Sequence, residues 1–540
     1  MSLLLLAPPA VALLYFLVGP FLSLLFRQSR SPLRHLPGPP SPSFFMGNLA
    51  DMHDQENNNL LARWERQYGH SFVYRGFIGG CRLMTTDPVA VAHILAHAYD
   101  YPKPDFVRDS LATMVAGHDG LLTVEGDHHR RQRKILSPAF TSTHIKSLAP
   151  IFWSKAIHLR DIWLAQADAA PSHSTRIDAL AWLARATLDV IGLAGFGYSF
   201  NSLTHTDNEL ADAFSTIFST ARKFRVITIL QVWFPVLRRF RRNNAAMADA
   251  NATMRRIGIQ LIDQKRNDIA SEKSTTSDID GDKTTLGRDL LSVLIRSNNA
   301  SASSQQMSTN EVLCQISTFI AAGHETTASA LTWCLYALGR DPHVQNRLRE
   351  ALREIAVDGA GAGKEEWDDQ LVDRVGRCDY LDWVVREALR VHAPVTNTMR
   401  VCMRDVDEIP VRRGDAKKGQ DEGGYTDKYG VRQWTIRVKR GDIISIPIQA
   451  INKSKDLWGE DALEFRPERW ATPPASARAI PGLYAHTLTF LNGNPSPTGG
   501  NRACIGWRFA LLEIKIFLYV LLRDIEFGMD PSLVVEKKVK

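Results

Sequence analysis

Cysteine is scarce in this sequence, and its spacing excludes two classes of protein. The six cysteines, at positions 81, 314, 334, 378, 402 and 504, form no C-x-x-C pair. Zinc modules and disulfide-stapled secreted domains need such clusters, so neither is expected, and the pattern fits a reducing compartment. Long lysine and arginine runs are also missing, although the formal net charge is +7. Nucleic acid is therefore not an expected partner, and a basic patch for an acidic protein is an equally good interpretation of the charge.

Charged residues are absent from Met1 to Phe26, and Arg27, Arg30 and Arg34 follow that stretch. As a helix it is long enough to cross a bilayer core of ~30 Å. A cleaved signal peptide would have a basic start and a shorter apolar core. Positive charge after the segment favours a body on the cytoplasmic side. We therefore predict a transmembrane anchor with a basic flank at 1–30; the prolines in it leave a tilted or partly interfacial anchor as the alternative.

Hydrophobic periodicity predicts a mainly α protein with a minor β part. A proline-rich hinge, 31–45, separates the anchor from one body, 46–540, which contains no internal repeat. Ser308 with Glu311 forms a capping-box pattern, which predicts a long helix that continues to Arg340. Strand-like runs are expected at 71–75, 82–85, 435–438 and 443–447, and a polar insertion at 414–433.

One cysteine lies in a glycine-lined turn. Cys504 follows Arg502 by two residues and precedes Gly506, and an amphipathic run begins directly after it. The N–H groups and positive dipole end of a helix N-terminus lower the pKa of a thiol, so this is a favourable place for a metal-binding thiolate. For an isolated cysteine, burial in the core would be the better interpretation.

The predicted helix 308–340 contains an unfavourable stretch in its middle. Gly323 precedes His324, Glu325 and two threonines, beginning with Thr326. A glycine there costs about 1 kcal/mol relative to alanine, and sequences accept such losses at functional sites. The acid beside a hydroxyl indicates proton transfer to a bound ligand. A helix–helix contact that needs a small residue is the alternative.

Glu387 and Arg390 share one face of a predicted helix. Such a pair is common on surfaces, where it contributes only tenths of a kcal/mol. The flanking residues are largely apolar, however, so we interpret the helix as buried. A buried pair needs further partners to offset its desolvation, and Arg469 in the segment 465–470 is the candidate.

The segment 126–134 is rich in basic residues, and we predict that a cationic helix begins there. His129 and Arg133, one turn apart, would grip carboxylates of a cofactor. The remaining cations, Arg130, Arg131 and Lys134, would face an acidic protein partner or, as for most charge runs, only solvent.

Taken together and in this order, these features resemble the cytochrome P-450 family of haem-thiolate monooxygenases, of the microsomal and fungal type. The resemblance covers essentially the whole chain, and it implies the P-450 fold and haem b with Cys504 as the axial thiolate ligand of the iron. Glu325 and Thr326 would deliver protons to iron-bound dioxygen, and Gly323 would leave room for it. The haem propionates would be held by His129, Arg133, Arg400 and Arg502. A structural network behind the cysteine would consist of Glu387, Arg390 and Arg469.

One departure from the family pattern precedes the cysteine. The pattern places phenylalanine seven residues before it, and this chain has Pro497 there. The expected lead-in, at Phe490, is separated from Gly499 by the residues Asn492–Thr498. The interruption is interpreted either as a loop on the face where a reductase docks or as an error of the gene model or a splice variant.

The expected activity is insertion of one oxygen atom from O2 into an apolar substrate, a secondary metabolite or a xenobiotic. The chain carries no flavin domain, so the resemblance implies electrons from NADPH through a separate flavoprotein reductase. It also implies the endoplasmic reticulum membrane, with one anchor and a cytosolic catalytic domain. Substrate contacts are expected from the regions 106–121, 214–232, 319–322 and 395–399, where Phe319, Ile320 and Val395 would line an apolar pocket or belong to the core.

Two other functions stay open on the sequence. The same fold and haem would serve an isomerase, a dehydratase or a peroxygenase, although the Glu325-Thr326 pair favours oxygen activation. If the interruption before Cys504 prevents haem binding, the chain would be a non-catalytic membrane protein.

Overall fold

The computed structural model describes residues 19, 22, 25–26, 28–53, 59–205, 207–222, 245–274, 287–357, 369–413, 423–492, 502–530, 532–533 and 535. Most of the predicted anchor, and the interruption after Asn492, lie outside these residues. The hinge, by contrast, is described, and its only helix is a short 3-10 turn, Pro32–His35.

Helices make up most of the described chain. They are α2 (Leu49–His53), α3 (Asn59–Tyr68), α4 (Pro88–Ala96), α5 (Asp105–Met114), α6 (Gly126–Leu136), α7 (Ser142–Ser147), α8 (Ala149–Asp168), α9 (Ala179–Phe196), α10 (Glu209–Arg222), α12 (Ala245–Ser274), α13 (Leu290–Ala300), α14 (Thr309–Arg340), α15 (Pro342–Val357), α16 (Asp369–Arg377), α17 (Asp379–Val391), α18 (Ile448–Asn452), α19 (Lys455–Trp458) and α20 (Trp507–Asp524).

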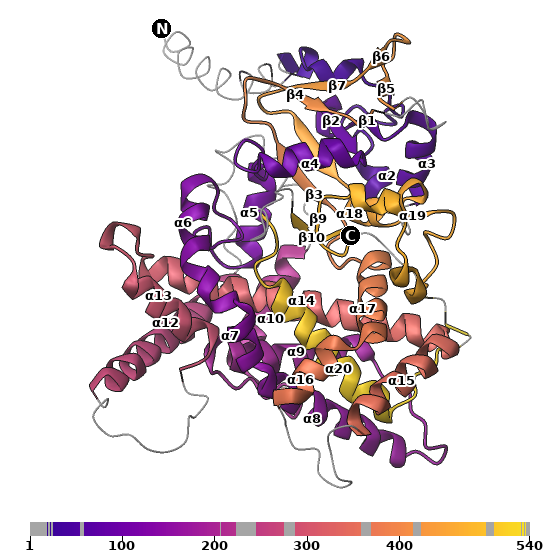
Figure 1. The fold of residues 1–540 in the computed structure, drawn as a ribbon. Helices are drawn as coiled ribbons and strands as arrows, with labels where there is room; N and C mark the ends of the chain where they lie inside the picture. Colours follow the sequence, from indigo (N-terminus) through magenta and orange to yellow (C-terminus); the bar gives the residue numbers. More distant parts are fainter. Residues whose placement is uncertain are drawn as a thin grey trace.

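The strands are short. Most of the labelled ones lie at the top of Figure 1, whereas β3, β9 and β10 lie closer to its middle. They are β1 (Ser71–Arg75), β2 (Cys81–Thr85), β3 (Thr398–Val401), β4 (Val406–Pro410), β5 (Tyr425–Thr426), β6 (Arg432–Gln433), β7 (Thr435–Lys439), β8 (Ile443–Ile446), β9 (Gly482–Tyr484) and β10 (Thr487–Asn492). The predicted mainly α composition with a minor β part is confirmed, and the expected strands 71–75, 82–85, 435–438 and 443–447 all form.

The largest sheet has the order β1-β2-β8-β3. β1 and β2 pair as an antiparallel hairpin, β2 and β8 pair in parallel, and β3 pairs antiparallel with β8. Its apolar side chains share a core with α4, α18 and α19. Because β3 carries Arg400, this sheet positions one of the predicted site residues.

Helix α14 runs through the centre of the larger core and packs along α9, with α17 and α20 also against it (Figure 1). The predicted capping box is present: the Ser308 hydroxyl accepts from the Glu311 N–H, and the Glu311 carboxylate accepts from the Ser308 N–H. Each bond pairs a backbone donor that a helix start otherwise leaves free. The stretch around Gly323 does not interrupt the helix.

Within the described residues one helix, α9, is long and apolar enough to cross a membrane. It contacts α8 and α14 and contributes buried residues such as Val190 and Ala194 to the core. Those contacts are typical of a core helix, so α9 gives no support for a second membrane segment.

Candidate functional site

Cys504 lies just before α20, in the turn that the sequence indicated. Its backbone N–H donates to the carbonyl oxygen of Phe490 over 2.9 Å. Phe490 belongs to β10, before the interruption, and Cys504 follows the residues 493–501 that the structure does not describe. This bond therefore joins the segments on either side of the interruption. The predicted lead-in at Phe490 therefore contacts the cysteine despite the added residues.

Cys504 is an exposed residue, and yet desolvation by the surrounding protein raises the pKa of its thiol. The Gly506 N–H and the Arg133 charge act in the opposite direction, as expected for a helix start, but burial is the larger effect. The expectation of a lowered pKa is therefore wrong for the chain without a ligand, since a buried thiolate needs a cation of its own.

Helix α6 brings two of the predicted cofactor-binding residues toward the cysteine. Arg133 donates to the carbonyl oxygen of Ala503 over 2.7 Å. His129, one turn earlier, is buried and lies 3.4 Å from the Tyr99 hydroxyl through Nδ1. Burial, together with the charges of Lys103 and Arg133, lowers the pKa of His129 to about 3. The i, i+4 spacing thus places both side chains on the inner face of the helix.

The outer face of α6 differs from its prediction at one residue. Arg130 and Lys134 are exposed. Arg131 instead turns inward, where it forms an ion pair with Glu311 and donates to the Gln306 carbonyl oxygen over 2.8 Å. It is therefore not part of a basic face for a partner, because α14 supplies the carboxylate that neutralises it.

Two further arginines predicted for the site are also inside the protein. Arg400 is 2% exposed and donates to the Thr398 hydroxyl and the Met399 carbonyl oxygen. Burial lowers its pKa to about 10. Arg502 contacts Glu125 and donates to the Val124 carbonyl oxygen, and burial lowers its pKa to about 10 as well.

Lys103 is a further buried cation close enough to Arg400 and Arg502 to feel their charges. Nothing in the sequence singled it out. Burial lowers its pKa well below the ordinary value, and the charges of Arg502 and Arg400 lower it further. The charge of Lys103 in turn lowers the pKa of His129. Within the described residues, Glu125 is the one carboxylate that forms ion pairs with Lys103 and Arg502.

The donor set near Cys504 fits haem. Four cations are largely buried here: Lys103, Arg133, Arg400 and Arg502. Among the described residues, Lys103 and Arg502 pair with the carboxylate of Glu125, whereas Arg133 and Arg400 donate to neutral oxygens. Buried charges need opposite charges or hydrogen bonds to offset desolvation. Two carboxylates on a flat cofactor would supply them, and the exposed thiol nearby is a metal ligand once it is deprotonated.

The middle of α14 opens toward solvent although most of the helix is buried. Ala322 is exposed, and Thr326, one turn later, donates from its hydroxyl to the Ala322 carbonyl oxygen over 2.7 Å. Of the side chains proposed for an apolar pocket, Val395 is 49% exposed, whereas Ile320 is fully buried. Phe319 is also core, since its ring lies between those of other buried phenylalanines, Phe140 and Phe196.

Gly323 lies against α9. A Cβ at this position would lie 3.0 Å from the Cγ1 and Cδ1 atoms of Ile191. The hydroxyl of Thr187, also on α9, donates to the His324 carbonyl oxygen over 3.0 Å. These contacts favour the helix–helix alternative for the glycine.

Glu325 lines a cavity of about 280 Å³ on the side of α14 that faces α9 and α10. The other lining residues are Leu188, Ala211, Phe214, Ser215, Ser219 and His324. Ser215 and Ser219 are exposed, so the cavity lies between Glu325 and solvent.

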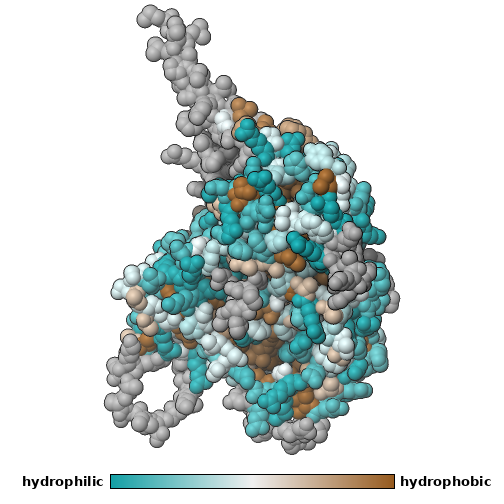
Figure 2. All heavy atoms as spheres, turned by 45° about the horizontal axis from the view of Figure 1, so that its top comes forward, coloured by the Kyte–Doolittle hydropathy of each residue, from teal (hydrophilic) through white to brown (hydrophobic). Residues whose placement is uncertain are grey.

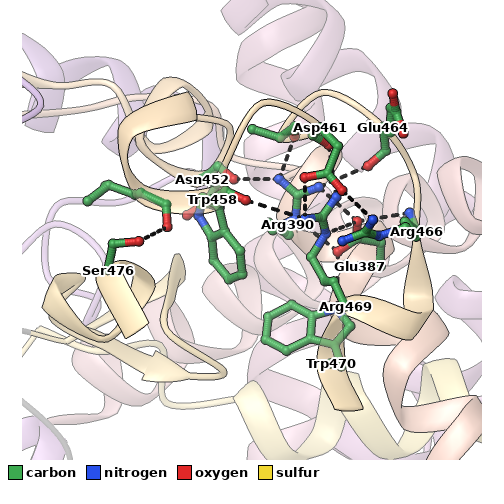
Figure 3. A network of polar contacts seen from close by, with 12 residues as sticks. Glu387, Arg390, Asn452, Trp458, Asp461, Glu464, Arg466, Arg469, Trp470 and Ser476 are labelled. Atoms are coloured by element: carbon green, nitrogen blue, oxygen red, sulfur yellow. Dashed lines mark hydrogen bonds and ion pairs between the residues drawn. The ribbon is translucent and has the colours of Figure 1, made fainter. Parts of the chain in front are cut away.

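Glu387 and Arg390 are fully buried on α17, and Figure 3 shows them at the centre of a polar network. Arg390 forms a two-bond pair with the Glu387 carboxylate, with distances of 2.9 and 2.8 Å. Its remaining N–H groups donate to the carbonyl oxygens of Asn452, Ala462 and Glu464. All donors of the buried guanidinium therefore have acceptors.

The candidate third member, Arg469, completes this network. Its Nε donates to Glu387 over 2.9 Å, and its other nitrogens donate to the side chain and backbone of Asp461. Trp470 also donates to Glu387, over 3.1 Å (Figure 3). The structure thus brings together the three residues that the sequence grouped.

A family model described as cytochrome P-450 matches residues 37–410 and 431–539 of the chain. The chain belongs to the cytochrome P-450 family. Membership implies haem with a cysteine thiolate ligand, in agreement with the donor set around Cys504.

Relatives of this P-450 include several fungal monooxygenases. The chain is 40% identical to cytochrome P-450 monooxygenase 205 of Postia placenta, over 98% of this chain and 92% of the relative. It is 39% identical to monooxygenase 128 of the same fungus, over 92% and 87%. The ganoderic acid synthetase of Ganoderma lucidum is 32% identical, over 93% and 89%. The enzyme is therefore an oxygen-incorporating oxidoreductase with relatives in fungal secondary metabolism.

Proposed function

We propose that this P-450 is a membrane-anchored monooxygenase that inserts one oxygen atom from O2 into an apolar organic substrate. The observation that carries the proposal is the exposed Cys504 before α20, with the Arg133 side chain bonded to the neighbouring Ala503 carbonyl oxygen. Of the buried cations of the site, Lys103 and Arg502 are the two that pair with a carboxylate, Glu125, within the described residues. When bound, haem supplies the activation of oxygen. Cofactor binding and proton delivery are the roles of side chains of this chain.

The cations bind and orient the cofactor. The cofactor carboxylates would accept hydrogen bonds from Arg133, Arg400 and Arg502. The neutral His129 and the Lys103 side chain would be further donors to them. Arg133 lies nearest the thiol among these groups, since it bonds the neighbouring Ala503 carbonyl and opposes the rise of the thiol pKa. It would therefore also stabilise the thiolate.

Proton delivery is assigned to Glu325 and Thr326. The cavity beside Glu325 gives this carboxyl a route to solvent, and Thr326 lies on the open face of α14 with Ala322. In this assignment Glu325 takes up protons from the cavity, and the Thr326 hydroxyl holds one at the site of oxygen binding. Replacing Thr326 by Ala should uncouple NADPH consumption from product, which would distinguish a monooxygenase from an isomerase or a dehydratase.

The substrate is proposed to be a secondary metabolite or xenobiotic with little polarity. Two observations support this: the exposed apolar side chain of Val395, and a relative named as a ganoderic acid synthetase. Difference spectra recorded with a panel of terpenes, steroids, fatty acids and aromatic compounds would identify the class that binds.

Electrons are proposed to come from NADPH through a separate flavoprotein reductase, with the exposed Arg130 and Lys134 among the docking cations. The uncharged first 26 residues support an anchor in the endoplasmic reticulum membrane, with the catalytic body in the cytosol.

The test is a reduced, carbon-monoxide difference spectrum of the full chain expressed with a reductase. The wild type should show the red-shifted band of a thiolate-ligated haem, and Cys504→Ser should lose it. Cys378→Ser, at a half-buried cysteine on another element, is the matched control and should keep it. An unchanged band in Cys504→Ser, or no NADPH-dependent oxidation by the wild type, would overturn the proposal.

A further inference from the structure

The P-450 family model leaves residues 411–430 unmatched, and the structure describes a hairpin whose first strand and turn lie in that segment and whose second strand lies in the matched part that follows. We call Gly423–Trp434 the added hairpin. Its strands β5 and β6 pair antiparallel, with Tyr425 opposite Gln433. A bridge between Arg413 and Gly423 ties its beginning to the rest of the chain.

The turn of the added hairpin is held by one carboxylate. Asp427 accepts hydrogen bonds from the backbone N–H groups of Tyr429 and Val431, both over 2.9 Å. The Gln433 side chain donates to it over 3.1 Å. Gly430, with a φ of 83°, supplies the left-handed residue that the turn needs. The side chains at the tip are therefore presented by an ordered turn.

The tip exposes apolar and aromatic side chains next to cations. Tyr429 is 65% exposed, Val431 53% and Trp434 36%. The Lys428 ammonium lies over the Tyr429 ring, 5.1 Å from its centroid. The guanidinium groups of Arg413 and Arg432 lie 5.8 and 5.9 Å from the centroid of the Trp434 ring. Asp427 is the acid facing these groups within the described hairpin, and it is engaged by the turn.

The added hairpin packs on the chain that leads out of the uncharged N-terminal stretch. The Lys428 N–H donates to the His35 carbonyl oxygen over 3.0 Å, and the rings of His35 and Tyr429 are 5.6 Å apart. A few residues earlier, Phe26 is 57% exposed, and Arg30 lies over its ring. β5 and β6 thus lie at the top of Figure 1, at the same end of the molecule as the strands β1, β2, β4 and β7, and Figure 2 shows small hydrophobic patches in the hydrophilic surface of this end.

We propose that the added hairpin is a second membrane contact that binds anionic lipid headgroups. Tyrosine and tryptophan favour the interface of a bilayer, where an apolar ring and a polar tip are both accommodated. Lysine and arginine beside them are attracted to anionic headgroups. The hairpin contributes Lys428 and Arg432, and Arg413 adds a third cation at its base. The inference rests on the proposed membrane anchoring, because the anchor brings the hairpin to the surface of the bilayer.

A lipid occupant is favoured over an acidic protein by position. The hairpin contacts His35, in the hinge that follows the uncharged stretch, so an anchor in that stretch would keep Tyr429 close to the bilayer. A protein partner at the same place would have to share the surface with the lipid.

The test uses the full chain carrying Tyr429→p-benzoylphenylalanine, reconstituted in liposomes of phosphatidylcholine with or without phosphatidylserine. Irradiation should produce lipid adducts at position 429, with a several-fold higher yield when phosphatidylserine is present. The same group at the exposed Leu180, at the beginning of α9, is the matched control and should give no lipid adduct. Combining Arg413→Gln, Lys428→Gln and Arg432→Gln should abolish the preference for phosphatidylserine.

Flotation of the liposomes is scored separately. A chain that floats but forms no lipid adduct at position 429 overturns the inference and leaves the anchor intact. A crosslink from position 429 that forms only with added reductase, and to the reductase rather than to lipid, also overturns the inference, in favour of a protein contact. A chain that does not float with either lipid overturns the anchoring and the inference together.

Discussion

The Glu387 network and the cations near Cys504 are both buried, and they differ in how their charge is compensated. In the network, Glu387 accepts from Arg390, Arg469 and Trp470, and every remaining donor of Arg390 has a backbone acceptor. Near the cysteine, the pKa values of Lys103, Arg133, Arg400 and Arg502 are all lowered, with burial as the largest cause.

The difference indicates that the Glu387 network stabilises the fold, whereas the cations near Cys504 serve to bind a cofactor. The network is complete within the chain, so it stabilises the fold whether or not a cofactor is bound. The second group raises the free energy of the ligand-free protein, because desolvated cations lie near one another. An anionic cofactor removes that penalty, so part of the binding energy is stored in the fold before binding.

The largest expected effect comes from removing the acid of the complete network. Glu387→Ala leaves two buried guanidinium groups without their carboxylate, which should lower the free energy of unfolding by about 3–5 kcal/mol. Chemical unfolding of the ligand-free protein measures it. The control is Glu464→Gln, because Glu464 joins the network through its backbone carbonyl only. A loss below about 1 kcal/mol would mean that the network is not structural.

A smaller effect of opposite sign is expected at the second group. Arg400→Leu should leave the stability of the ligand-free protein unchanged or raise it, because one uncompensated buried cation is removed. Haem affinity should fall roughly 10- to 100-fold, the effect of one hydrogen bond to a charged group of about 1.5–3 kcal/mol. Haem titration and chemical unfolding measure the two quantities.

Arg437→Gln, on the exposed face of β7, is the matched control for this experiment. A loss of ligand-free stability as large as that of Glu387→Ala would contradict the contrast between the two groups.

Two histidines extend the comparison to pH. His70 lies between carboxylates, and its hydrogen bonds to Asp456 and Glu65 raise its pKa to about 9. Its stabilising contribution is complete below about pH 6.5 and is lost as the pH rises to about 9. The pKa of His129 is about 3 instead, so the unfolded chain binds the proton first and stability falls as the pH drops from 6.5 toward 3.

Unfolding of His70→Gln and His129→Gln as a function of pH measures both effects. The difference between wild type and variant should change only above pH 6.5 for the first and only below it for the second. Bound haem should shrink the acid effect of His129, because nearby carboxylates raise its pKa. Parallel pH profiles of wild type and variant would contradict either assignment.

The smallest expected effect concerns a buried acid with little compensation. Glu513 on α20 is fully buried, and no hydrogen bond of good geometry reaches its carboxylate oxygens in the described part of the chain. Burial raises its pKa well above the ordinary value, and a weak interaction with the Thr327 side chain opposes that rise only in part. Glu513→Leu should therefore raise the free energy of unfolding by about 1 kcal/mol, the lower end of the penalty for a poorly paired buried group. A thermal unfolding scan measures the change, and a loss of stability would show that the interaction with Thr327 outweighs the cost of burial.

Much of the local structure could be predicted from the sequence because caps and periodicity act over a few residues. The capping box at Ser308 predicted the beginning of α14, and short strand-like runs of residues predicted β1 and β7. The inward side of α6 followed from the i, i+4 spacing of His129 and Arg133. The partner of Arg131 did not, because Glu311 is 180 residues away.

The site was only partly predictable for the same reason. Lys103 lies in an unremarkable Tyr-Pro-Lys-Pro context, and only the fold brings it to the cations. The alternatives for Gly323 could not be separated without its neighbour, Ile191. The thiol pKa was predicted with the wrong sign because the effect of a helix N-terminus is local, whereas burial depends on the whole fold.

By itself, the sequence determined which residue types lie at which spacing: the cysteine turn, the acid-threonine pair and the Glu387-Arg390 pair. Only the tertiary structure decided their surroundings. It joined Phe490 to Cys504 across the interruption, supplied every acceptor of Arg390, and gave Lys103 and Arg502 a single shared carboxylate, Glu125, among the described residues. Spacing sets the face on which a side chain lies, but compensation of a buried charge depends on segments distant in the chain, which meet only after folding.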